Sequence, residues 1–510
     1  MPTARLREFN VVIKDVRKVD VLFGYCYPST YRAGMTGLAT HIFYSVLNAR
    51  EDTSCERYFR YDIPSPGRSV ETARPLHDNH IVGFSLTYEE NILGMIQMLD
   101  LGGVPVLARD REDKHPIVLV GGPVVNSNPE PYVDFVDAFV IGEGDLVVHD
   151  IIDVVRESIS REEALVKIAL LKGIYVPAVN PSSVTRLIMK DIDSVFHPTA
   201  QIVPDVPVGA KLEPVFGKSF LLEVARGCGH SCKFCLVGHI CQPRRVRSIG
   251  RLKEIIEIGL QETPVRKIAL IASSIGDLKE LEDLADWIVT QDLQMSAPSL
   301  RADIVTEGLL ASLVAGGQRT LTIAPETGSE SLRSAMGKGL SDAAIENAVS
   351  LAAQAGYKAI KLYFIVGLPG ETDEDVKAIP EMVKRLSSGR RLRISVGVNP
   401  FVPKAQTQFQ RSAQPPIEVI RHKIRTVERG LRNVPRVNVE SLDPRNARIQ
   451  AALSLGDRSI GKVIRRAASY DGLSGWRRAE KETNIPFFSL ANDAQRLQGA
   501  LPWSIIRKQR

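Results

Sequence analysis

The sequence predicts an α/β protein made of two parallel-sheet regions followed by a small helical region. Short, continuous apolar runs alternate with helical stretches along most of the chain, which is typical of parallel strands covered on both faces. The 510 residues also exceed the size at which one hydrophobic core stops growing, about 250–300 residues. The predicted regions are residues 1–205, 214–430 and 431–510.

The first region, residues 1–205, is predicted to be a doubly wound, Rossmann-like sheet. Its apolar runs each end in small or turn residues and are separated by helical stretches; they are "VDVLFGY", "IVGFSL", "PIVLVGG" and "AFVIGEG". Ligands of such sheets bind beyond the carboxyl ends of the strands. A β-rich connector at residues 173–194 and a proline-rich linker at residues 197–214 are expected to follow.

The second region, residues 214–430, is predicted to be an incomplete parallel barrel of six β/α units. Its candidate strands are "SFLLEVA", "KIALIAS", "QMSAPSL", "QRTLTIAP", "AIKLYFIVG" and "RLRISVGVN", and a helical stretch follows most of them. In such barrels the functional residues lie at the carboxyl ends of the strands. The third region, residues 431–510, is predicted to be mostly helical.

Composition bounds the function only loosely. A net charge of +6 is mild for this length, so it permits an RNA or other anionic partner without arguing for one. No apolar run approaches the roughly 20 residues of a membrane helix, and the first residues lack the apolar centre of a signal peptide. We therefore expect a cytoplasmic protein without membrane contact. Six cysteines are too few for a disulfide scaffold of this size.

Four of the six cysteines lie in "RGCGHSCKFCLVGHICQPRRVRS", at Cys228, Cys232, Cys235 and Cys241. A zinc clip usually takes two ligand pairs separated by a longer loop, whereas this is one compact loop. A four-cysteine electron-transfer cluster of the bacterial type ends in Cys-Pro, whereas Gln242 follows Cys241. Scattered core cysteines would not be expected to gather in so short a stretch. Spacing alone leaves these three alternatives open.

The pattern Cys-x3-Cys-x2-Cys, with Phe234 before its last cysteine, resembles that of the radical S-adenosylmethionine (radical SAM) superfamily. Three thiolates would leave one iron of a cubane open, as catalytic metal sites keep an open position. Three further stretches resemble the fourth, fifth and sixth barrel strands of that superfamily: "LTIAPETGSESLRSAMGKGLS", "KLYFIVGLPGETDEDV" and "SVGVNPFVPKAQTQFQ". The resemblance covers residues 214–415.

This resemblance implies a [4Fe-4S] cluster held by Cys228, Cys232 and Cys235, whose open iron binds SAM. Reductive cleavage of SAM would give a 5′-deoxyadenosyl radical that abstracts hydrogen from a substrate, with the hard chemistry supplied by the cofactors. The electron would come from a donor such as ferredoxin or flavodoxin. The substrate, a small molecule or RNA, is not named by the sequence, because one scaffold serves many reactions.

The resemblance also implies SAM-binding roles for residues at the strand ends. Phe234 stands where an aromatic residue approaches the adenine. Ser273 and Ser274, with Gly276, stand where the superfamily has Gly-Gly-Glu for the SAM amino group, so backbone carbonyls would have to serve here. The remaining candidates are Arg301 for the SAM carboxylate or for a structural ion pair, Glu326 for SAM or for a helix cap, and Gly367 and Gly370 for the adenine or for turn geometry.

Two features near the cysteines stay open. Cys241 is either a partly buried thiol or a thiol that faces the substrate. The stretch "QPRRVRS" places Arg244, Arg245 and Arg247 after the loop, either as a solvated or ion-paired face or as a site for a phosphate of the substrate or of a tRNA.

A Rossmann-like domain before such a barrel resembles the cobalamin-binding architecture. The pattern Asp-x-His-x-x-Gly occurs at Asp78, His80 and Gly83, but it directly precedes an apolar strand, and the loop "GYCYPSTYRAGMTGL" has no histidine. We interpret the match as accidental. Four other positions fit the architecture, namely Ser85, Thr87, Gly121 and Gly122. The domain would then bind cobalamin without a histidine ligand, bind another group, or gate the barrel.

Stretches such as "YPSTYRAGMTGLATHIFYSVLN" and "LSLGDRSIGKVI" extend the resemblance over nearly the whole chain, to an uncharacterised branch with a degenerate cobalamin-like domain. The sequence therefore predicts a radical SAM enzyme of unknown substrate. Two alternatives remain: a cobalamin-dependent radical SAM methyltransferase, and, in another class, a non-enzymatic zinc or iron–sulfur protein.

Overall fold

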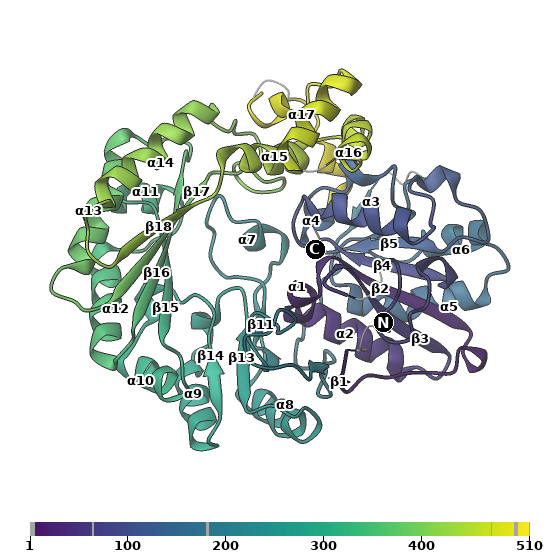
Figure 1. The fold of residues 1–510 in the computed structure, drawn as a ribbon, viewed down its shortest axis with the longest axis horizontal. Coiled ribbons are helices and arrows are strands. Elements are labelled where there is room, and N and C mark those ends of the chain that lie inside the picture. Colours follow the sequence, from purple (N-terminus) through teal and green to yellow (C-terminus); the bar gives the residue numbers. More distant parts are fainter. Residues whose placement is uncertain (1–5, 64–65, 180–182, 471, 494–497, 509–510) are drawn as a thin grey trace.

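Two sheet-based halves face each other in the computed structural model, and three C-terminal helices lie across one end of both (Figure 1). The structure describes residues 6–508 without 64–65, 180–182, 471 and 494–497. No helix within these residues is long and apolar enough to cross a membrane.

The N-terminal half contains a sheet of strand order β3-β2-β4-β5-β6-β7. Its strands are parallel except for the last, which is antiparallel; they are β2 (Val21–Thr30), β3 (Thr53–Tyr61), β4 (Ile81–Ser85), β5 (Ile117–Gly121), β6 (Ala138–Val140) and β7 (Ile174–Tyr175). The chain runs from β2 to β3 on one side and returns to β4 on the other. Ligands of open α/β sheets bind at such a switch point, beyond the carboxyl ends of the strands.

Helices cover both faces of this sheet, as predicted. One core contains apolar side chains of α2 (Leu38–Ala49) and α5 (Val148–Glu157), and a second core contains those of α3 (Asn91–Leu101). Shorter elements complete the half: α1 (Tyr31–Thr36), α4 (Pro123–Ser127), α6 (Arg161–Ile168), β1 (Glu8–Phe9), β8 (Val184–Thr185) and β9 (Val203–Pro204). Strands β7 and β8 lie in the predicted β-rich connector, of which residues 180–182 fall outside the described residues.

The second half has two parallel sheets, β10-β13-β14 and β15-β16-β17-β18. A parallel bridge between Leu300 and Ile323 joins them into one wall (Figure 1). The strands are β10 (Phe220–Glu223), β13 (Lys267–Ile271), β14 (Gln294–Ser296), β15 (Thr320–Glu326), β16 (Ala359–Val366), β17 (Arg393–Pro400) and β18 (Val437–Ser441). The prediction of an α/β fold with parallel sheets is confirmed.

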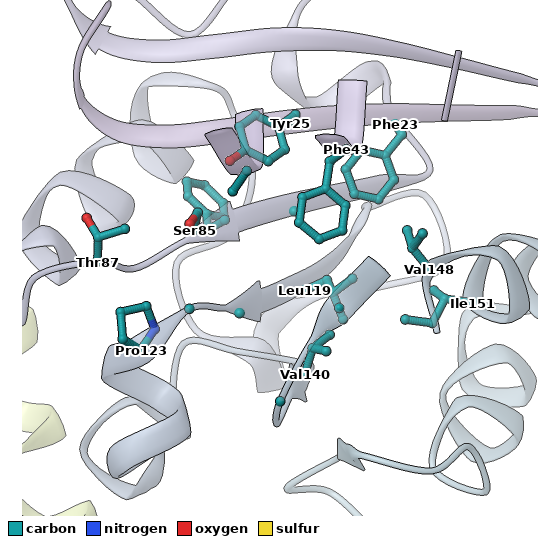
Figure 2. A pocket seen from close by; sticks show the side chains of 17 residues that line it. Phe23, Tyr25, Phe43, Ser85, Thr87, Leu119, Pro123, Val140, Val148 and Ile151 are labelled. Atoms are coloured by element: carbon teal, nitrogen blue, oxygen red, sulfur yellow. The ribbon is translucent and has the colours of Figure 1, made fainter. Parts of the chain in front are cut away.

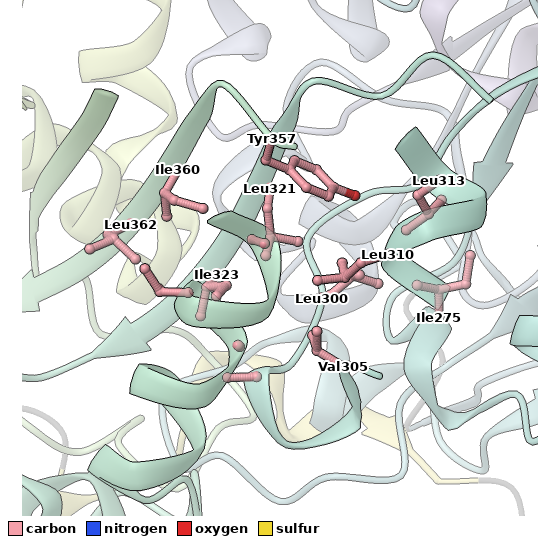
Figure 3. Close-up of a cluster of buried hydrophobic side chains, with 14 of the residues drawn as sticks. Ile275, Leu300, Val305, Leu310, Leu313, Leu321, Ile323, Tyr357, Ile360 and Leu362 are labelled. Atoms are coloured by element: carbon pink, nitrogen blue, oxygen red, sulfur yellow. The ribbon is translucent and has the colours of Figure 1, made fainter. Parts of the chain in front are cut away.

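Helices pack against one face of this wall and share one core with it. They are α8 (Ile249–Glu262), α9 (Leu281–Thr290), α10 (Glu307–Ala315), α12 (Asp342–Ala355), α13 (Asp373–Ser387) and α14 (Ile417–Leu431). Helix α11 (Glu330–Ala335) contributes to a separate small apolar cluster. Figure 3 shows part of the core, in which Leu321, Ile360 and Leu362 point from the strands toward neighbouring apolar side chains. A serine or threonine side chain caps the first turn of several helices, at Ser248, Thr306, Ser329, Ser341 and Thr372.

Residues 431–510 contain helices and also a strand that the sequence did not predict. They contribute β18, which pairs parallel to β17 and extends the wall. This strand, "VNVES", was missed because only two valines alternate with polar residues, so it lacks the continuous apolar run of a buried parallel strand. Three helices follow, α15 (Pro444–Leu455), α16 (Gly461–Ala467) and α17 (Gly472–Thr483), and then β19 (Ile506–Arg507), which pairs with β8. The helices share the core that contains α3.

His197, in the proline-rich linker, is a buried neutral imidazole that holds β10 in place. Its Nε2 accepts a hydrogen bond from the Glu223 amide at 3.0 Å, and its Nδ1 lies 3.2 Å from the Pro198 carbonyl, to which it donates in this tautomer. Burial is the main cause that lowers the pKa of His197 to about 3. The folded state thus resists a protonation that the unfolded chain accepts near pH 6.5.

We expect His197 to make the protein less stable in acid. Because its folded pKa lies below its unfolded pKa, its stabilisation is complete above pH 6.5 and is lost as pH falls toward 3, by roughly 4 kcal/mol at pH 3.5. Denaturant unfolding between pH 7 and pH 4 should show a shallower pH dependence for His197→Gln than for the wild type. The exposed His422 provides the control, since His422→Gln should keep the wild-type slope.

Candidate active site

The cysteine loop begins beyond the carboxyl end of β10, after the short β11 (Ala225–Arg226). Gly227 has φ +79°, and a Cβ there would lie 2.1 Å from the Cys241 carbonyl oxygen, so glycine is required where the loop closes on itself. The loop also contains α7 (Val237–Ile240) and β12 (Arg245–Val246). Helix α7 lies between the two halves of the molecule (Figure 1).

The segment after α11 holds the cysteine loop in place. The Lys233 amide donates to the Met336 carbonyl at 2.9 Å. A Cβ at Gly337 would lie 2.9 Å from the Ser231 carbonyl oxygen, so the two backbones touch. Strand β15 and helix α11 thereby place residues 336–338 directly beside Cys232.

The predicted ligands Cys228, Cys232 and Cys235 lie in this loop, and none of them forms a disulfide in the described part of the chain. Burial raises the pKa of Cys232, and the positive charges of Lys338 and Arg301 oppose that rise. The described residues include no group of three histidine, cysteine or acidic side chains arranged for one metal ion. A cubane cluster has no need of such a group, because each of its cysteines binds a different iron. The donor set, three thiols in one pinned loop, therefore fits a cluster.

Glu326 and Lys338 form an ion pair beside the thiols. Their Oε1 and Nζ atoms are 3.0 Å apart, and their side chains are only 13% and 12% exposed. Burial raises the pKa of Glu326, and Lys338 opposes the rise. Glu326 has φ +72° at a break in the β15–β16 register, a strained conformation of the kind that gathers at functional sites.

Arg301 makes the structural ion pair that the sequence left open. Its Nε and Nη2 lie 3.0 Å and 2.7 Å from the two Asp303 carboxylate oxygens. Its Nη1 donates to the Lys338 carbonyl at 3.1 Å. Arg301 thus fixes the segment that carries Lys338, while its own charge acts on Cys232.

The other predicted residues lie at the same end of the wall. Phe234 packs on an apolar cluster that contains Met336, Leu368 and Phe401. Ser273 and Ser274 follow β13, and Gly367 follows β16 with φ +88°. The Gly367 amide donates to the Glu371 carboxylate at 2.6 Å, so local turn structure already uses this position.

A cavity of about 240 Å³ lies at the switch point of the N-terminal sheet. Ser85, Thr87, Gly121 and Gly122 all line it, which brings together the four positions that resembled a cobalamin domain. The remaining lining is mainly apolar, and Figure 2 shows Phe23, Tyr25, Phe43, Leu119 and Val140 around the space. Its volume is below the roughly 300–1,000 Å³ of sites that enclose a whole ligand, so it suits one arm of a larger ligand.

His80 lies away from this cavity, in agreement with the interpretation of its motif as accidental. It precedes β4 at the amino-terminal edge of the sheet, where its Nδ1 accepts from the Leu22 amide at 2.9 Å. The cavity opens at the carboxyl ends of the strands, where Gly122 has φ +107° and leaves no room for a Cβ against the Leu86 carbonyl.

Two family models match the chain: the N-terminal model of radical SAM proteins over residues 39–177, and the radical SAM superfamily model over residues 222–383. The second match contains the three-cysteine loop and the Glu326–Lys338 pair. The chain belongs to the radical SAM superfamily. It is an enzyme of that superfamily, which sets aside the alternative of a non-enzymatic metal protein.

Relatives of this radical SAM enzyme are uncharacterised or named as methyl- and methylthiotransferases. An uncharacterised protein of Methanocaldococcus jannaschii is 30% identical over 459 residues, 89% of this chain and 92% of that protein. An uncharacterised methyltransferase of Pyrococcus horikoshii is 27% identical over 53% of this chain and 58% of that protein.

Two solved structures share the fold. The radical SAM methyltransferase TsrM from Kitasatospora setae, with cobalamin and a [4Fe-4S] cluster bound, has a TM-score of 0.57 and 12% identity over 91% of this chain and 98% of that one. The cobalamin-dependent SAM radical enzyme OxsB has a TM-score of 0.51 and 15% identity over 94% and 74%.

Sequence reasoning missed two charged residues that lie beside the cysteine loop. Lys338 lies between Gly337 and Gly339, which both have positive φ. A Gly-Lys-Gly turn of this kind is the sequence feature that could have indicated a positioned lysine side chain. Arg226 directly precedes the cysteine loop and pairs with Glu143 and Asp145 of the N-terminal half, at 2.9 Å each. Nothing local in the sequence indicates that pairing.

Arg245 and Arg247, two of the three arginines after the cysteines, are ion-paired inside the protein. Arg245 donates to the Glu143 carboxylate at 2.5 Å. Arg247 donates to the Glu223 carboxylate at 3.0 Å and to three backbone carbonyls, and its side chain is fully buried. The ion-paired alternative therefore holds for both, and neither is available to a phosphate of a substrate or a tRNA.

Proposed function

We propose that Cys228, Cys232 and Cys235 hold a [4Fe-4S] cluster and that SAM binds between this loop and the carboxyl ends of β13 to β16. The observation that carries the proposal is the contact of the three-thiol loop with the segment bearing the Glu326–Lys338 pair. Membership of the superfamily implies both cofactors. When bound, the cluster supplies the electron that cleaves the sulfonium of SAM and yields the 5′-deoxyadenosyl radical.

The residues around the thiols would bind and orient SAM. Lys338, with Arg301 beside it, offers positive charge for the SAM carboxylate, and Glu326 offers a hydrogen-bond acceptor next to it. Backbone carbonyls at Ser273 and Ser274 would receive the SAM amino group. Phe234 and the turn at Gly367 would border the adenine.

Apolar side chains keep water from one side of this site. Phe234 packs with Leu332, Met336, Leu368 and Phe401, and the last four are at least 94% buried. A dry wall next to the place where a radical forms limits its side reactions. The electron donor would be a ferredoxin or flavodoxin, and free thiols with a reducible cluster suit the reducing cytoplasm.

Anaerobic reconstitution tests this function. We expect about four irons and four sulfides per chain, a brown colour, and formation of 5′-deoxyadenosine from SAM when a strong reductant is added. Stoichiometric zinc without sulfide in anaerobically purified protein, or no SAM cleavage by the iron-loaded protein, would contradict it.

A second candidate, cobalamin-dependent methyl transfer, is supported by the cavity at the switch point. Gly121 and Gly122 would let a flat group approach the sheet, and the apolar cavity would receive one arm of the ligand. Radical SAM relatives named as methyltransferases and the fold shared with TsrM and OxsB favour the same candidate. Because the loop after β2 has no histidine, cobalt would bind without a histidine from below.

We expect the protein to bind hydroxocobalamin and to give the spectrum of a form without a nitrogen ligand from the protein. A Cβ at Gly121 meets only the Val140 Cβ at 3.8 Å, so Gly121→Val should fold, fill the cavity and lose cobalamin. His80→Ala should bind as the wild type does. Retention of cobalamin by Gly121→Val, or its loss in His80→Ala, would exclude this arrangement.

A further inference from the structure

Strands β15 to β18 are apolar on the face that packs against the helices and polar on the opposite, inner face. The strand register aligns the inner side chains in levels across the wall. One level consists of Thr322, Lys361, Ser395 and Asn438. The next level toward the carboxyl ends consists of Tyr363, Gly397 and Glu440, and the level toward the amino ends contains Arg393.

The first part of the wall is built differently. On β10 and β13 the inner side chains Leu221 and Ala269 are buried in a core shared with helices α1 and α2 of the N-terminal half. Closed barrels likewise fill their interior with layers of packed side chains, mostly branched. In contrast, Lys361 and Tyr363 are half-buried, and Arg393, Asn438 and Glu440 are exposed. The inner face of β16 to β18 is therefore built to meet something polar rather than the protein's own core.

The side chains on this inner face contact one another, and these contacts fix their positions. Lys361 Nζ lies 5.1 Å from the centre of the Tyr363 ring. A Cβ at Gly397 would lie 2.8 Å from Tyr363 Cδ1, so glycine on β17 leaves space for the ring to lie across the neighbouring strand. Asn438 Nδ2 donates to Glu440 at 3.3 Å. The face thus presents an aromatic ring with hydrogen-bonding groups on both sides.

Positive charge dominates the amino-terminal end of this face. A hydrogen bond to Tyr363 is the main cause that raises the pKa of Lys361, which keeps the ammonium charged. In the described part of the chain, no carboxylate lies within contact distance of Lys361 or Arg393, although the Glu440 carboxylate attracts the Lys361 ammonium from a neighbouring level. Glu440 is placed one level nearer the carboxyl ends. Two cations with a nearby carboxylate suit one anionic group better than the repeated phosphates of RNA.

We propose that this inner face binds the substrate, and that the substrate is a small, ring-bearing molecule with a carboxylate or phosphate. The inference rests on the proposed function, since it names the substrate of that same site. The anionic group would pair with Lys361 and Arg393, the ring would stack on Tyr363, and the polar row would bind its substituents. From Lys361 to the end of β16 the chain rises roughly 16 Å toward the cysteine loop. A molecule of nucleotide size would therefore reach the SAM site with its other end.

Binding of simple ring-bearing anions to the anaerobic holoenzyme tests the site. The probes are phenyl phosphate and phenylacetate, with neutral 2-phenylethanol for comparison, measured by calorimetry. We expect saturable binding of at least one anion, and whichever binds shows whether the substrate carries phosphate or carboxylate. The neutral compound should not bind. Failure of both anions, or equal binding of the neutral compound, would overturn the proposal.

Variants of Lys361 and Tyr363 test whether the anion binds to this face. Lys361→Gln should weaken the anion at least tenfold, whereas Lys358→Gln, at an exposed lysine just before β16, should leave its affinity unchanged. Tyr363→Ala should weaken binding and Tyr363→Phe should restore it, because the ring is kept. Equal affinity in Lys361→Gln and the wild type would overturn the proposal. So would binding of a tRNA that depends on Lys361 when neither small anion binds.

The experiments distinguish a failure of the proposed function from a failure of the proposed substrate site. If the wild type binds the anions through Lys361 but forms no 5′-deoxyadenosine, the function fails and the site stands. If the wild type cleaves SAM but the anions bind independently of Lys361, the site fails and the function stands.

Discussion

Replacing Cys232 by alanine is expected to abolish SAM cleavage and to leave the protein colourless after reconstitution. Cys232 is the most buried of the three predicted ligands, at 8% exposure, and its loop is fixed against residues 336–338. Because the loop backbone is fixed, it cannot shift to bring another side chain to the position of the Cys232 thiol. Iron and sulfide should fall well below four per chain, and 5′-deoxyadenosine should become undetectable.

Cys241→Ser provides the matched control for this prediction. Cys241 lies in the same loop, but beyond α7 and close to Arg186, Glu143 and Arg245 of the interface between the halves. Burial raises the pKa of Cys241 as it does that of Cys232, so position and not ionisation separates the two thiols: Cys241 lies outside the Cys-x3-Cys-x2-Cys pattern. The variant should therefore keep its iron. Equal iron loss in Cys241→Ser and Cys232→Ala would indicate a four-cysteine site instead.

Lys404→Ala is expected to lower the free energy of unfolding by about 3–5 kcal/mol, the range measured when one partner of a buried ion pair is removed. Lys404 follows β17 and pairs with Glu89, which follows β4 in the other half and is only 5% exposed. Gln450 of α15 donates to the same carboxylate at 2.9 Å. Without Lys404, the Glu89 charge would remain buried with only neutral hydrogen bonding.

Urea unfolding measures this effect, with Lys377→Ala as the control. Lys377 lies on the exposed face of α13, 3.7 Å from Glu374, and its loss should cost less than about 1 kcal/mol. The double variant Glu89→Leu, Lys404→Met should recover much of the lost stability, since no charge is then buried alone. A loss in Lys404→Ala no larger than in Lys377→Ala would show that the pair does not join the halves.

Buried parallel strands were predictable because each is a continuous apolar run, and "IVGFSL" and "PIVLVGG" became β4 and β5. Strand β18 was not, because one of its faces is exposed and its apolar content is two valines. The stretch "AIKLYFIV" was predicted only as an apolar strand, whereas in β16 every second residue is fully buried and the others form the inner face. That alternation departs from the uniformly apolar strand of a closed barrel and thus carried information about the site.

The candidate site was predictable where its residues are neighbours in the chain. The spacing of Cys228, Cys232 and Cys235 is a local pattern that indicates a cluster. Lys338 acquires its meaning only when β15 and the turn after α11 bring it to Glu326. The burial of Arg245 and Arg247 depends on carboxylates at Glu143 and Glu223, and Glu143 lies about a hundred residues away. Long-range pairing of this kind leaves no trace in local spacing.

The C-terminal helices also determine when the protein can finish folding. Helix α3 shares its core with Val463, Ile464 and Trp476, residues that are synthesised long after it. At about 5–20 residues per second, the interval between synthesis of β7 and of α15 is roughly 15–55 s. Throughout that time the N-terminal half has all its strands but lacks the cover for one apolar helix face. The newly made chain therefore passes through a period in which this surface is open to chaperones and to other nascent chains.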